Sequence, residues 1–355
     1  MNSPAPLRAY RLRVPLTTPY RLAFGALEAF DTILVECGDA EGRVGLGEAT
    51  VLTGYTDETI EDSWRAAREL AQALAPLGAG ERRERVLPLA AQRPFLASAF
   101  LTAFEMLAGS PLLRIEAETR VPILALLNAD DEDALHEEFE RLYGAGYRTF
   151  KVKVGFDPRK DLAHVAQVQS VVAGRAAIRV DANQAYSAAD GVAFVRALDP
   201  RGIELFEQPC AAGDWQSHLE VARAAQVPMM LDESIYGLAD IERAAALRAA
   251  AFVKVKLMKL GTLAALADAL ERIRALGMKP VLGNGVACDL GCWMEACVAA
   301  RHVDNAGEMN GFLKPRARLL DEPLEVREGA IRLRAGYRPR FDRDRAEPFI
   351  LETVP

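Results

Sequence analysis

The sequence predicts an α/β protein whose larger part is a (β/α)8-type barrel, a modified TIM barrel, joined to a smaller α+β unit. The first observation is a series of four short apolar runs that each end in a charged residue: Asp181, Glu207, Asp232 and Lys256. These residues follow one another after 26, 25 and 24 positions, about the length of one strand, one helix and two loops. The second observation is that strand-like runs alternate with Ala-, Arg- and Glu-rich helical stretches from residue 121 onward.

Residues 1–120 are expected to form the α+β unit. Apolar and polar residues alternate over about the first 55 positions, around a turn at Asp39–Gly42, and this alternation is typical of antiparallel strands. Thr56 and Asp57 are suitable N-caps for an amphipathic helix, and a second, more apolar helical stretch begins at Pro94. The unit is therefore expected to fold as a sheet covered by helices.

Residues 121–320 predict the barrel, because they contain eight strand candidates separated by helical stretches. The candidates are Val121–Leu127, Thr149–Val154, Ile178–Asp181, Leu205–Glu207, Met229–Asp232, Phe252–Lys256, Pro280–Leu282 and Gly307–Met309. After residue 320 the pattern changes to strand, turn at Glu328–Gly329 and strand, which has no place among the outer helices of a barrel. We therefore predict that residues 321–355 return to the N-terminal β segment and make that unit discontinuous.

The composition argues against several other classes of protein. The 355 residues carry a net charge of −7 and contain no basic run interleaved with aromatic residues, so nucleic-acid binding is not expected. The sequence lacks the long apolar stretch of a signal peptide or membrane anchor, which predicts a cytoplasmic protein without a membrane partner. Five cysteines, an odd number, do not suit a disulfide framework, and four histidines without an HExxH pattern argue against a zinc hydrolase.

The three acidic residues at the predicted strand ends indicate a metal site. If the runs are strands of one parallel barrel, Asp181, Glu207 and Asp232 meet at its C-terminal mouth, where TIM barrels carry their chemistry. Three carboxylates in one place repel one another unless a cation lies between them. Oxygen ligands favour Mg²⁺, with Mn²⁺ as an alternative. Helix N-caps or a structural ion pair are the competing interpretation of the same residues.

Two lysines in "FKVKVG" belong with these acidic residues. Lys151 and Lys153 lie two positions apart on one strand, so both point to the same side, which in a barrel is the interior. An unpaired ammonium group is costly there, so both must meet anions. Lys153 and Lys256 would then flank the metal from opposite sides. A carboxylate substrate between them could lose its α-proton to one lysine, the metal charge would stabilise the enediolate, and the other lysine could return a proton or assist a leaving group.

The ordered motifs "KVKVG", "VDANQAY", "FEQP", "LDES" and "VKLMKLG" closely resemble the enolase superfamily, specifically its muconate-lactonizing-enzyme subgroup. The resemblance covers the whole predicted barrel, and the N-terminal segment with the C-terminal hairpin is similar to the capping domain of that family. It implies that Asp181, Glu207 and Asp232 bind Mg²⁺ and that Lys153 and Lys256 form the acid/base pair.

The same resemblance implies further contacts around the substrate. Lys151 would donate a hydrogen bond to the substrate carboxylate, and Asn183 and Glu233 would orient the metal site from behind. The cap would contribute specificity through the loop at Tyr20–Phe24 and through Tyr55 in "TGYTDE".

Lys256 has two neighbours of the same type, Lys254 and Lys259. Lys254 shares the face of Lys256 by the two-residue period of a strand. The "KLMK" match nevertheless selects Lys256, and Lys259 is expected in a salt bridge or at a helix entry.

The resemblance fails at the seventh strand. Relatives usually carry a glutamate there, whereas "GNGVACDLG" has Ala287, with Asp289 two positions later, so this acid is missing or has moved to Asp289. At the eighth strand, "GEMNG" places Glu308 and Asn310 where dipeptide epimerases have an Asp-x-Asp pair that holds an amine. We therefore expect substrate contacts from Asp289, Glu308 and Asn310.

Together these observations predict a Mg²⁺-dependent enzyme that abstracts a proton α to a carboxylate. The expected reaction is the racemisation, epimerisation or cycloisomerisation of an amino-acid-derived or other small carboxylic acid. A lyase, either a dehydratase or an enzyme similar to o-succinylbenzoate synthase, is the main alternative, and a non-catalytic metal- or metabolite-binding protein is a remote one. The expected partners are the small-molecule carboxylate and further copies of the chain, in a dimer or an octamer.

Overall fold

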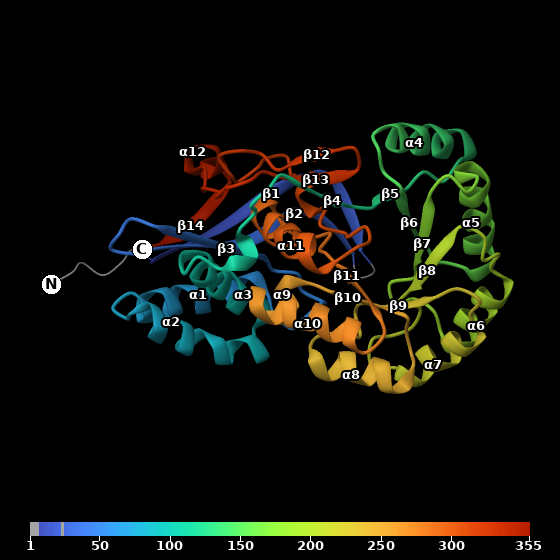
Figure 1. Ribbon diagram of the computed structural model, residues 1–355, viewed down its shortest axis with the longest axis horizontal. Coiled ribbons are helices and arrows are strands. Elements are labelled where there is room, and N and C mark those ends of the chain that lie inside the picture. The colour runs from blue at the N-terminus through green and yellow to red at the C-terminus, as the bar shows by residue number, and fades with distance from the viewer. Residues whose placement is uncertain (1–6, 23–24) are drawn as a thin grey trace.

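The computed structural model describes residues 7–22 and 25–355, and these form two parts that lie side by side (Figure 1). One part is an antiparallel sheet with helices, and both ends of the described chain belong to it. The other part is a curved parallel sheet whose outside is covered by helices. The fold is therefore an α/β barrel with an α+β capping domain, which is the predicted fold class.

The capping sheet has the strand order β14-β1-β2-β3, and every pair of neighbours is antiparallel. The elements of this domain are β1 (Leu7–Leu22), β2 (Gly25–Gly38), β3 (Val44–Thr50), α1 (Ile60–Leu74), α2 (Ala79–Val86), η1 (Leu87–Ala91), α3 (Pro94–Leu107), η2 (Pro111–Leu113), α12 (Arg343–Ala346), η4 (Glu347–Phe349) and β14 (Ile350–Val354). Helix α1 begins later than Thr56 and Asp57 suggested. Its N-cap is Thr59, whose hydroxyl accepts from Asp62 N at 3.2 Å, so the helix begins where the first satisfied cap lies.

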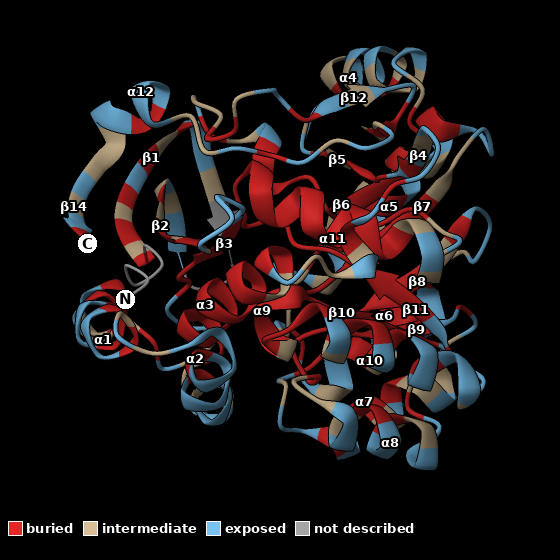
Figure 2. Ribbon diagram, turned by 60° about the vertical axis from the view of Figure 1, so that its left-hand side comes forward, coloured by how far each residue is buried: buried red, intermediate tan, exposed pale blue. Residues whose placement is uncertain are grey.

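Helix α3 packs directly on β3 and is buried along nearly its whole length. The close packing requires glycine in the strand. A Cβ at Gly47 would lie 2.1 Å from Ala99 O, and a Cβ at Gly45 would lie 2.1 Å from Ala103 O. Because α3 is buried on all sides, it forms a layer between the capping sheet and the barrel, where Figure 2 shows it together with α9 (Leu257–Leu260) and α11 (Asp289–His302).

The barrel sheet contains seven parallel strands in the order β11-β10-β9-β8-β7-β6-β5. The strands are β5 (Ala125–Leu127), β6 (Thr149–Lys153), β7 (Ala177–Asp181), β8 (Ile203–Glu207), β9 (Met229–Leu231), β10 (Phe252–Val255) and β11 (Lys279–Leu282). The remaining helices around them are α4 (Glu132–Gly144), α5 (Pro158–Val172), α6 (Ala188–Ala197), α7 (Trp215–Ala224), α8 (Leu238–Leu247) and α10 (Leu263–Ala275). Within the described part of the chain, no helix is both long and apolar enough to cross a membrane.

The predicted eighth strand, Gly307–Met309, is reduced to a bridge that closes the barrel. Gly307 pairs with Ile123 on one side, and Glu308 N donates to Leu282 O at 3.0 Å on the other. The chain is tightly packed here, since a Cβ at Gly283 would lie 2.5 Å from Glu308 N. This closure places Glu308 on the rim of the barrel between the first and last strands.

The C-terminal hairpin does not pair where the sequence suggested. Strands β12 (Glu325–Arg327) and β13 (Ala330–Leu333) form a three-stranded antiparallel sheet with β4 (Thr119–Pro122), so the expected return of this hairpin to the N-terminal β segment is wrong. The predicted strand Val121–Leu127 is split into β4 and β5, which leaves an edge of β4 for β13 to cover. It is β14, at the very end of the chain, that pairs with β1.

Candidate active site

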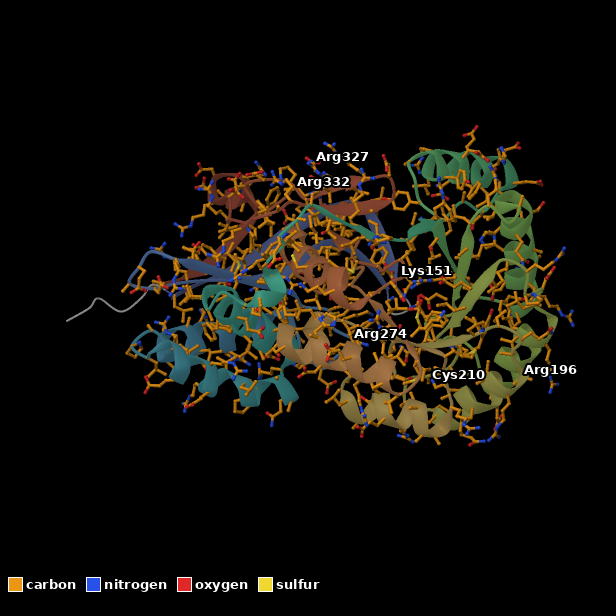
Figure 3. All side chains as sticks on the ribbon, viewed as in Figure 1. Lys151, Arg196, Cys210, Arg274, Arg327 and Arg332 are labelled. Carbon is orange, nitrogen blue, oxygen red and sulfur yellow. The ribbon has the colours of Figure 1, made fainter. Side chains whose placement is uncertain are left out.

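A small cavity lies at the C-terminal ends of the barrel strands, beneath the capping domain. Its volume is about 30 Å³, room for about two water molecules. The cavity is lined by Tyr20, Leu52, Tyr55, Lys151, Lys153, Asp181, Asn183, Asp232, Lys254, Lys256, Met258, Asn284, Gly285, Val286 and Glu308. Figure 3 shows Lys151 deep between the two parts of the molecule, whereas Arg196 lies on the outer rim. Larger hollows of about 260 and 540 Å³ lie elsewhere, but neither is lined by a cluster of acidic residues and lysines.

The three acidic residues that the spacing singled out lie at adjacent strand ends. Asp181 and Glu207 are the last residues of β7 and β8 and lie opposite each other in the parallel ladder. Asp232 directly follows β9. All three are at most 1% exposed, so their charges must be balanced within the protein.

Lys151 supplies part of that balance. Its Nζ lies 2.7 Å from Asp181 Oδ2, 2.9 Å from Glu207 Oε2 and 3.0 Å from Glu308 Oε2. Burial alone would lower the pKa of Lys151, but the three carboxylates hold this pKa well above its usual value. Lys151 is therefore a buried cation at the point where the carboxylates converge.

Lys254 is a member of the site that the motif match passed over in favour of Lys256. Its Nζ lies 3.1 Å from Glu207 Oε1 and 3.4 Å from Asp232 Oδ2, and it also contacts Glu308. Despite burial, these carboxylates raise the pKa of Lys254. The two-residue alternation of the strand was the signal that places Lys254 in the interior.

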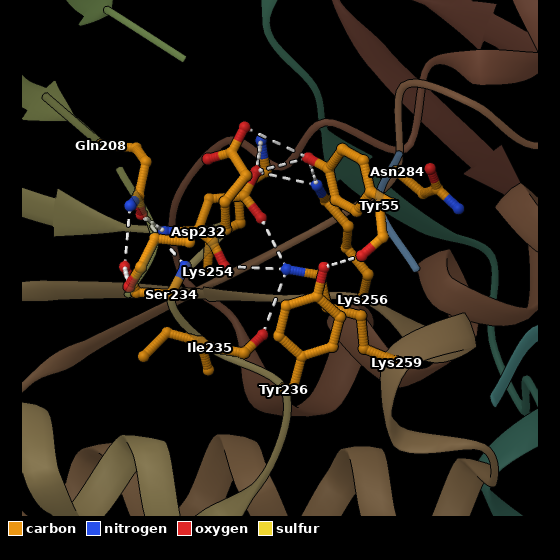
Figure 4. A network of polar contacts seen from close by, with 12 residues as sticks. Tyr55, Gln208, Asp232, Ser234, Ile235, Tyr236, Lys254, Lys256, Lys259 and Asn284 are labelled. Carbon is orange, nitrogen blue, oxygen red and sulfur yellow. Dashed lines mark hydrogen bonds and ion pairs between the residues drawn. The ribbon is translucent and has the colours of Figure 1, made fainter. Parts of the chain in front are cut away.

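Lys256 and Lys259 hold Asp232 from the other side, as Figure 4 shows. Lys256 Nζ lies 2.8 Å from Asp232 Oδ2 and donates to the hydroxyl of Tyr55 at 2.5 Å. Lys259 Nζ lies 3.1 Å from Asp232 Oδ1 and donates to the main-chain oxygen of Ile235, also at 3.1 Å. The expected salt bridge of Lys259 is therefore made with the carboxylate of Asp232.

Lys153 differs from the other lysines of the cavity. Within the described part of the chain it has no carboxylate partner in ion-pair distance, and its Nζ lies 5.5 Å from the centre of the Tyr20 ring. Burial lowers the pKa of Lys153, and the neighbouring charge of Lys151 lowers it further. Lys153 is thus a buried ammonium group of the site without a carboxylate in direct contact among the described residues, and its surroundings favour its neutral form.

Asn183 and Glu233 lie behind the acidic residues, as expected. Asn183 N donates to Asp181 Oδ1 at 2.9 Å, and Asn183 Nδ2 donates to Glu233 Oε1 at 3.1 Å. Tyr55 from the cap donates its hydroxyl hydrogen to the same Glu233 oxygen at 3.4 Å. Burial and the nearby Asp232 raise the pKa of Glu233 to about 7.

The structure adds a polar network that positions Asp232 and that the sequence analysis missed. Gln208 Oε1 accepts from Asp232 N at 2.9 Å, while Gln208 Nε2 contacts Ser234 Oγ at 2.7 Å and His218 Nε2 at 3.1 Å. Gln208 follows β8 with a φ of 38°, a left-handed conformation that turns its amide toward β9. The motif "FEQP" contained this residue, but only the three-dimensional pairing of β8 and β9 shows its role.

The three residues near the seventh and eighth strands that were expected to contact the substrate lie in different places. Asp289 lies outside the cavity, because both of its oxygens accept backbone hydrogen bonds at 3.0 Å from Leu319 and Leu320, so the expectation that it contacts substrate is wrong. Glu308 lines the cavity and pairs with lysines. Asn310 is buried and donates to Leu124 O at 3.3 Å.

Of the residues that the capping domain was expected to contribute, two line the cavity. Tyr20 and Tyr55 both line the cavity, whereas Phe24 lies outside the residues that the structure describes. Ala287, at the place of the missing glutamate, lines a second, smaller cavity of about 10 Å³ beyond Met258.

The donor set fits a hard divalent cation. Asp181 Oδ2 and Glu207 Oε2 are buried and accept no hydrogen bond, although both face the ammonium group of Lys151. Carboxylate oxygens of this kind suit Mg²⁺ or Mn²⁺. Among the described residues, the carboxylates do not lie in a group of three spaced around one metal position, and the ammonium groups of Lys151 and Lys254 contact the same Glu207 carboxylate.

Comparison with known proteins places this site in a family. A family profile described as "Enolase C-terminal domain-like" matches residues 134–338. The L-Lys-D/L-Arg epimerase of Methylococcus capsulatus is 34% identical over 266 residues, which cover 70% of this chain and 73% of that protein. The chain belongs to the enolase superfamily. Its relatives place it in the mandelate racemase and muconate lactonizing enzyme subgroup, as the motifs indicated.

One further relative agrees with this assignment, and one solved structure has the same fold. The N-succinyl-L-Arg/Lys racemase of Bacillus cereus is 25% identical over 309 residues, covering 83% of this chain and 81% of that protein. The crystal structure of a dipeptide epimerase from Cytophaga hutchinsonii, complexed with Mg and the dipeptide D-Ala-L-Val, superposes with a TM-score of 0.87 at 19% identity, over 98% of each chain. The predicted enzyme class, an enolase-superfamily isomerase, is therefore confirmed by the relatives.

Proposed function

We propose that this enolase-superfamily member is a Mg²⁺-dependent racemase or epimerase that exchanges the α-proton of an amino-acid-derived carboxylic acid. One observation carries the proposal. Lys153 and Lys256 approach one cavity from β6 and from the end of β10, with the strands that bear Asp181, Glu207 and Asp232 between them. Bases on two sides of one substrate position are what a reaction that inverts a stereocentre requires.

Asp181, Glu207 and Asp232 would hold the metal ion. When bound, Mg²⁺ supplies positive charge beside the substrate carboxylate and favours the negative charge that develops when the α-proton leaves. The same charge would compete with the ammonium group of Lys151 for the carboxylates. Lys151 could then turn its hydrogen-bond donors toward the substrate carboxylate, and Asn183 and Glu233 would keep the acidic residues in place.

The two lysines would exchange roles according to the isomer that is bound. Lys153 has no carboxylate partner in ion-pair distance among the described residues, and burial lowers its pKa, so it would start neutral and accept a proton. Lys256 Nζ lies 2.8 Å from Asp232 Oδ2, and in this reaction it would donate a proton to the opposite face. For the other isomer, the same two groups would act in reverse.

A panel of substrates in D₂O tests this proposal. Racemic and single-isomer amino acids, N-acyl amino acids and dipeptides are incubated with the enzyme and Mg²⁺, and the α-proton signal is followed by proton NMR. Loss of that signal with formation of the second isomer supports a racemase or epimerase. Absence of any exchange across the panel, with and without Mg²⁺, would contradict it.

A lysine variant separates catalysis from metal binding. Lys153→Ala should remove exchange from one isomer while Mg²⁺ still binds, because Lys153 has no metal-ligating role in the proposal. Lys279→Met is the matched control, since Lys279 is an exposed lysine at the opposite end of the barrel strands. Unchanged exchange in Lys153→Ala would exclude the two-lysine mechanism.

A lyase is the alternative that the same experiment separates, because it would produce new vinyl signals rather than a second isomer. A cycloisomerase would give a ring product without overall loss of mass. The proposed assembly is a homodimer or an octamer, and light scattering after size-exclusion chromatography measures it directly.

A further inference from the structure

The small cavity beyond Met258 lies between the capping domain and the barrel. Its volume is about 10 Å³, room for about one water molecule. Its wall is formed by β3 and α3 of the cap and by α9 and α11 of the barrel, and Figure 2 shows the three helices buried next to one another. None of the residues proposed to bind the metal or to transfer a proton lines it. It is therefore a feature of the junction between the two domains.

Three buried polar atoms of residues that line this cavity have no hydrogen-bond partner among the described residues. They are Glu48 Oε2 from β3, Ser98 Oγ from α3 and Glu295 Oε2 from α11. The three residues are at most 4% exposed. Buried polar atoms are almost always paired in folded proteins, and an exception indicates a bound water molecule or ion. Three exceptions around one cavity indicate one shared partner.

The other oxygen of each carboxyl group is bound to the backbone of the barrel. Glu48 Oε1 accepts from Cys288 N at 2.6 Å, and Glu295 Oε1 accepts from Leu257 N at 2.8 Å. Gly291 leaves room for Glu48 beside α11, because a Cβ at this glycine would lie 3.1 Å from Glu48 Oε1. Each carboxyl group is therefore fixed in position by one oxygen, and its second oxygen is available for a ligand.

No cationic side chain contacts these two carboxyl groups. Within the described part of the chain, no lysine, arginine or histidine nitrogen lies within 4.0 Å of either group. Burial and the neighbouring charge of Asp289 raise the pKa of Glu48 to about 8. Despite the more distant charges of Lys256 and Lys254, burial raises the pKa of Glu295 to about 7. The junction therefore favours the uptake of positive charge, either as protons or as a cation.

The space in the cavity favours a cation over protons alone. A proton on a carboxyl group needs no space of its own, and it would leave Ser98 Oγ without a partner. An ion of about the size of a water molecule fits the cavity, and carboxylate and hydroxyl oxygens suit a hard cation. Hydrated Mg²⁺ does not fit, because it keeps several of its water ligands and the cavity has room for about one.

We propose that Glu48, Ser98 and Glu295 form a site for one desolvated monovalent cation, Na⁺ or K⁺, which joins the capping domain to α11 of the barrel. This inference goes beyond the proposed function and depends neither on the substrate nor on Mg²⁺. The competing explanation is a neutral water molecule between the carboxyl groups. The two explanations differ in whether the stability of the fold depends on the monovalent cation in the buffer.

Urea denaturation in matched salts tests the site. The free energy of unfolding is measured at about pH 9, above the pKa of both carboxyl groups, in NaCl, KCl or choline chloride at equal ionic strength. Choline is too large for a cavity of about 10 Å³ and serves as the inert cation. We expect NaCl, KCl or both to stabilise the protein relative to choline chloride. Once the site is mostly occupied, each ten-fold rise in the bound cation's concentration should add about 1.4 kcal/mol. Equal stability in the three salts would overturn the site.

Variants assign the salt effect to this cavity. Glu48→Gln and Glu295→Gln each keep an oxygen for the backbone N–H but remove the charge, so each should abolish the difference between the salts. Glu58→Gln is the matched control and should keep the full difference. Glu58 is also a buried acid of the cap, but its two oxygens accept from Phe95 N at 2.8 Å and from Leu96 N at 3.1 Å. A difference of wild-type size in either Glu48→Gln or Glu295→Gln would mean that the cation binds elsewhere, and it would overturn the proposal.

Ser98→Ala tests the site without a change of charge, and it decides the proposal if a glutamine variant does not fold. Ser98 Oγ has no partner among the described residues, so its removal should not lower stability in choline chloride. If this oxygen is a ligand of the cation, its removal should raise the Na⁺ or K⁺ concentration that gives half of the stabilisation by about ten-fold. An unchanged concentration would overturn the three-residue site.

Discussion

Glu295 provides a test of how Lys256 is held. Glu295 lies on α11, is 0% exposed, and its Oε1 accepts from Leu257 N at 2.8 Å. Leu257 is the first residue of α9, a single helical turn, and Lys256 is the N-cap of that turn. Burial raises the pKa of Glu295 to about 7. The contact therefore links a buried carboxyl group on α11 to the backbone that carries a proposed acid/base residue.

The size of the effect follows from that contact. Glu295→Leu leaves the buried N–H of Leu257 without an acceptor, which costs about 1–3 kcal/mol. Glu295→Gln keeps a side-chain oxygen for the same N–H. If the turn shifts by about 1 Å to recover a partner, the rate of proton transfer through Lys256 falls about 100-fold. We therefore expect Glu295→Leu to lose between about 10- and 100-fold in that transfer, and Glu295→Gln to stay much closer to wild type.

The assay measures α-proton exchange separately for each isomer in D₂O with Mg²⁺. Because Lys153 and Lys256 reach the cavity from different strands, each should remove the proton from one isomer only. The loss in Glu295→Leu should fall on the isomer whose proton faces Lys256. Exchange from the other isomer, which begins at Lys153, should change much less.

An equal loss for both isomers would refute this reasoning, as would a Glu295→Gln variant that is as impaired as Glu295→Leu. Circular dichroism and urea denaturation verify that each variant is folded. Met294→Leu is a suitable control, because Met294 is the buried neighbour of Glu295 on the same helix, whereas the hydrogen bond to Leu257 N is made by Glu295.

Three further predictions concern stability. Burial raises the pKa of Glu48 to about 8, from an ordinary value of 4.5. Between these two pH values the folded chain keeps a proton that the unfolded chain releases, so the free energy of unfolding should fall by up to about 1.4 kcal/mol per pH unit as the pH rises. Urea titrations across this range should show the slope in the wild type and not in Glu48→Gln. Asp289→Ala should lower the free energy of unfolding by about 1–3 kcal/mol, because the backbone N–H groups of Leu319 and Leu320 lose their acceptor. Substrate selectivity should not change, and a changed selectivity would mean that Asp289 does contact the substrate. Gly47→Ala should destabilise the cap by about 1–3 kcal/mol, whereas Gly80→Ala, where a Cβ meets no atom within 4 Å, should not; equal thermal midpoints for the two variants would contradict the packing argument.

The acidic residues were predictable from spacing alone because parallel strands leave no freedom in where their ends lie. Once β7, β8 and β9 are neighbours in one sheet, residues at their C-terminal ends share one rim. The same argument covers Lys151 and Lys153, whose two-residue spacing fixes a common face. Their proposed roles still depend on the resemblance to the superfamily, but their meeting point follows from strand geometry.

Residues reached through loops and helices were not predictable in this way. Asp289 follows the site residues closely in sequence, yet it begins α11 and its carboxylate turns to the amides of Leu319 and Leu320. Lys314 reaches the cavity wall from a loop that has no periodicity from which its direction could be read. The hairpin after residue 320 has a clear strand pattern, but a strand pattern contains no information about which edge it joins.

Lys151 connects the balance of charge to stability, and this connection gives a final prediction. Its ammonium group now neutralises Asp181 and Glu207, and a Lys151→Met variant would leave these buried carboxylates with less counter-charge. Breaking one side of such a buried pair costs about 3–5 kcal/mol.

Added Mg²⁺ should therefore stabilise Lys151→Met more than it stabilises the wild type. In the variant the cation replaces the missing ammonium charge, whereas in the wild type it must compete with the ammonium group of Lys151. Urea denaturation of both proteins, with Mg²⁺ and with EDTA, measures this difference. Equal stabilisation of the two proteins would mean that the metal and the Lys151 ammonium do not share the same carboxylates.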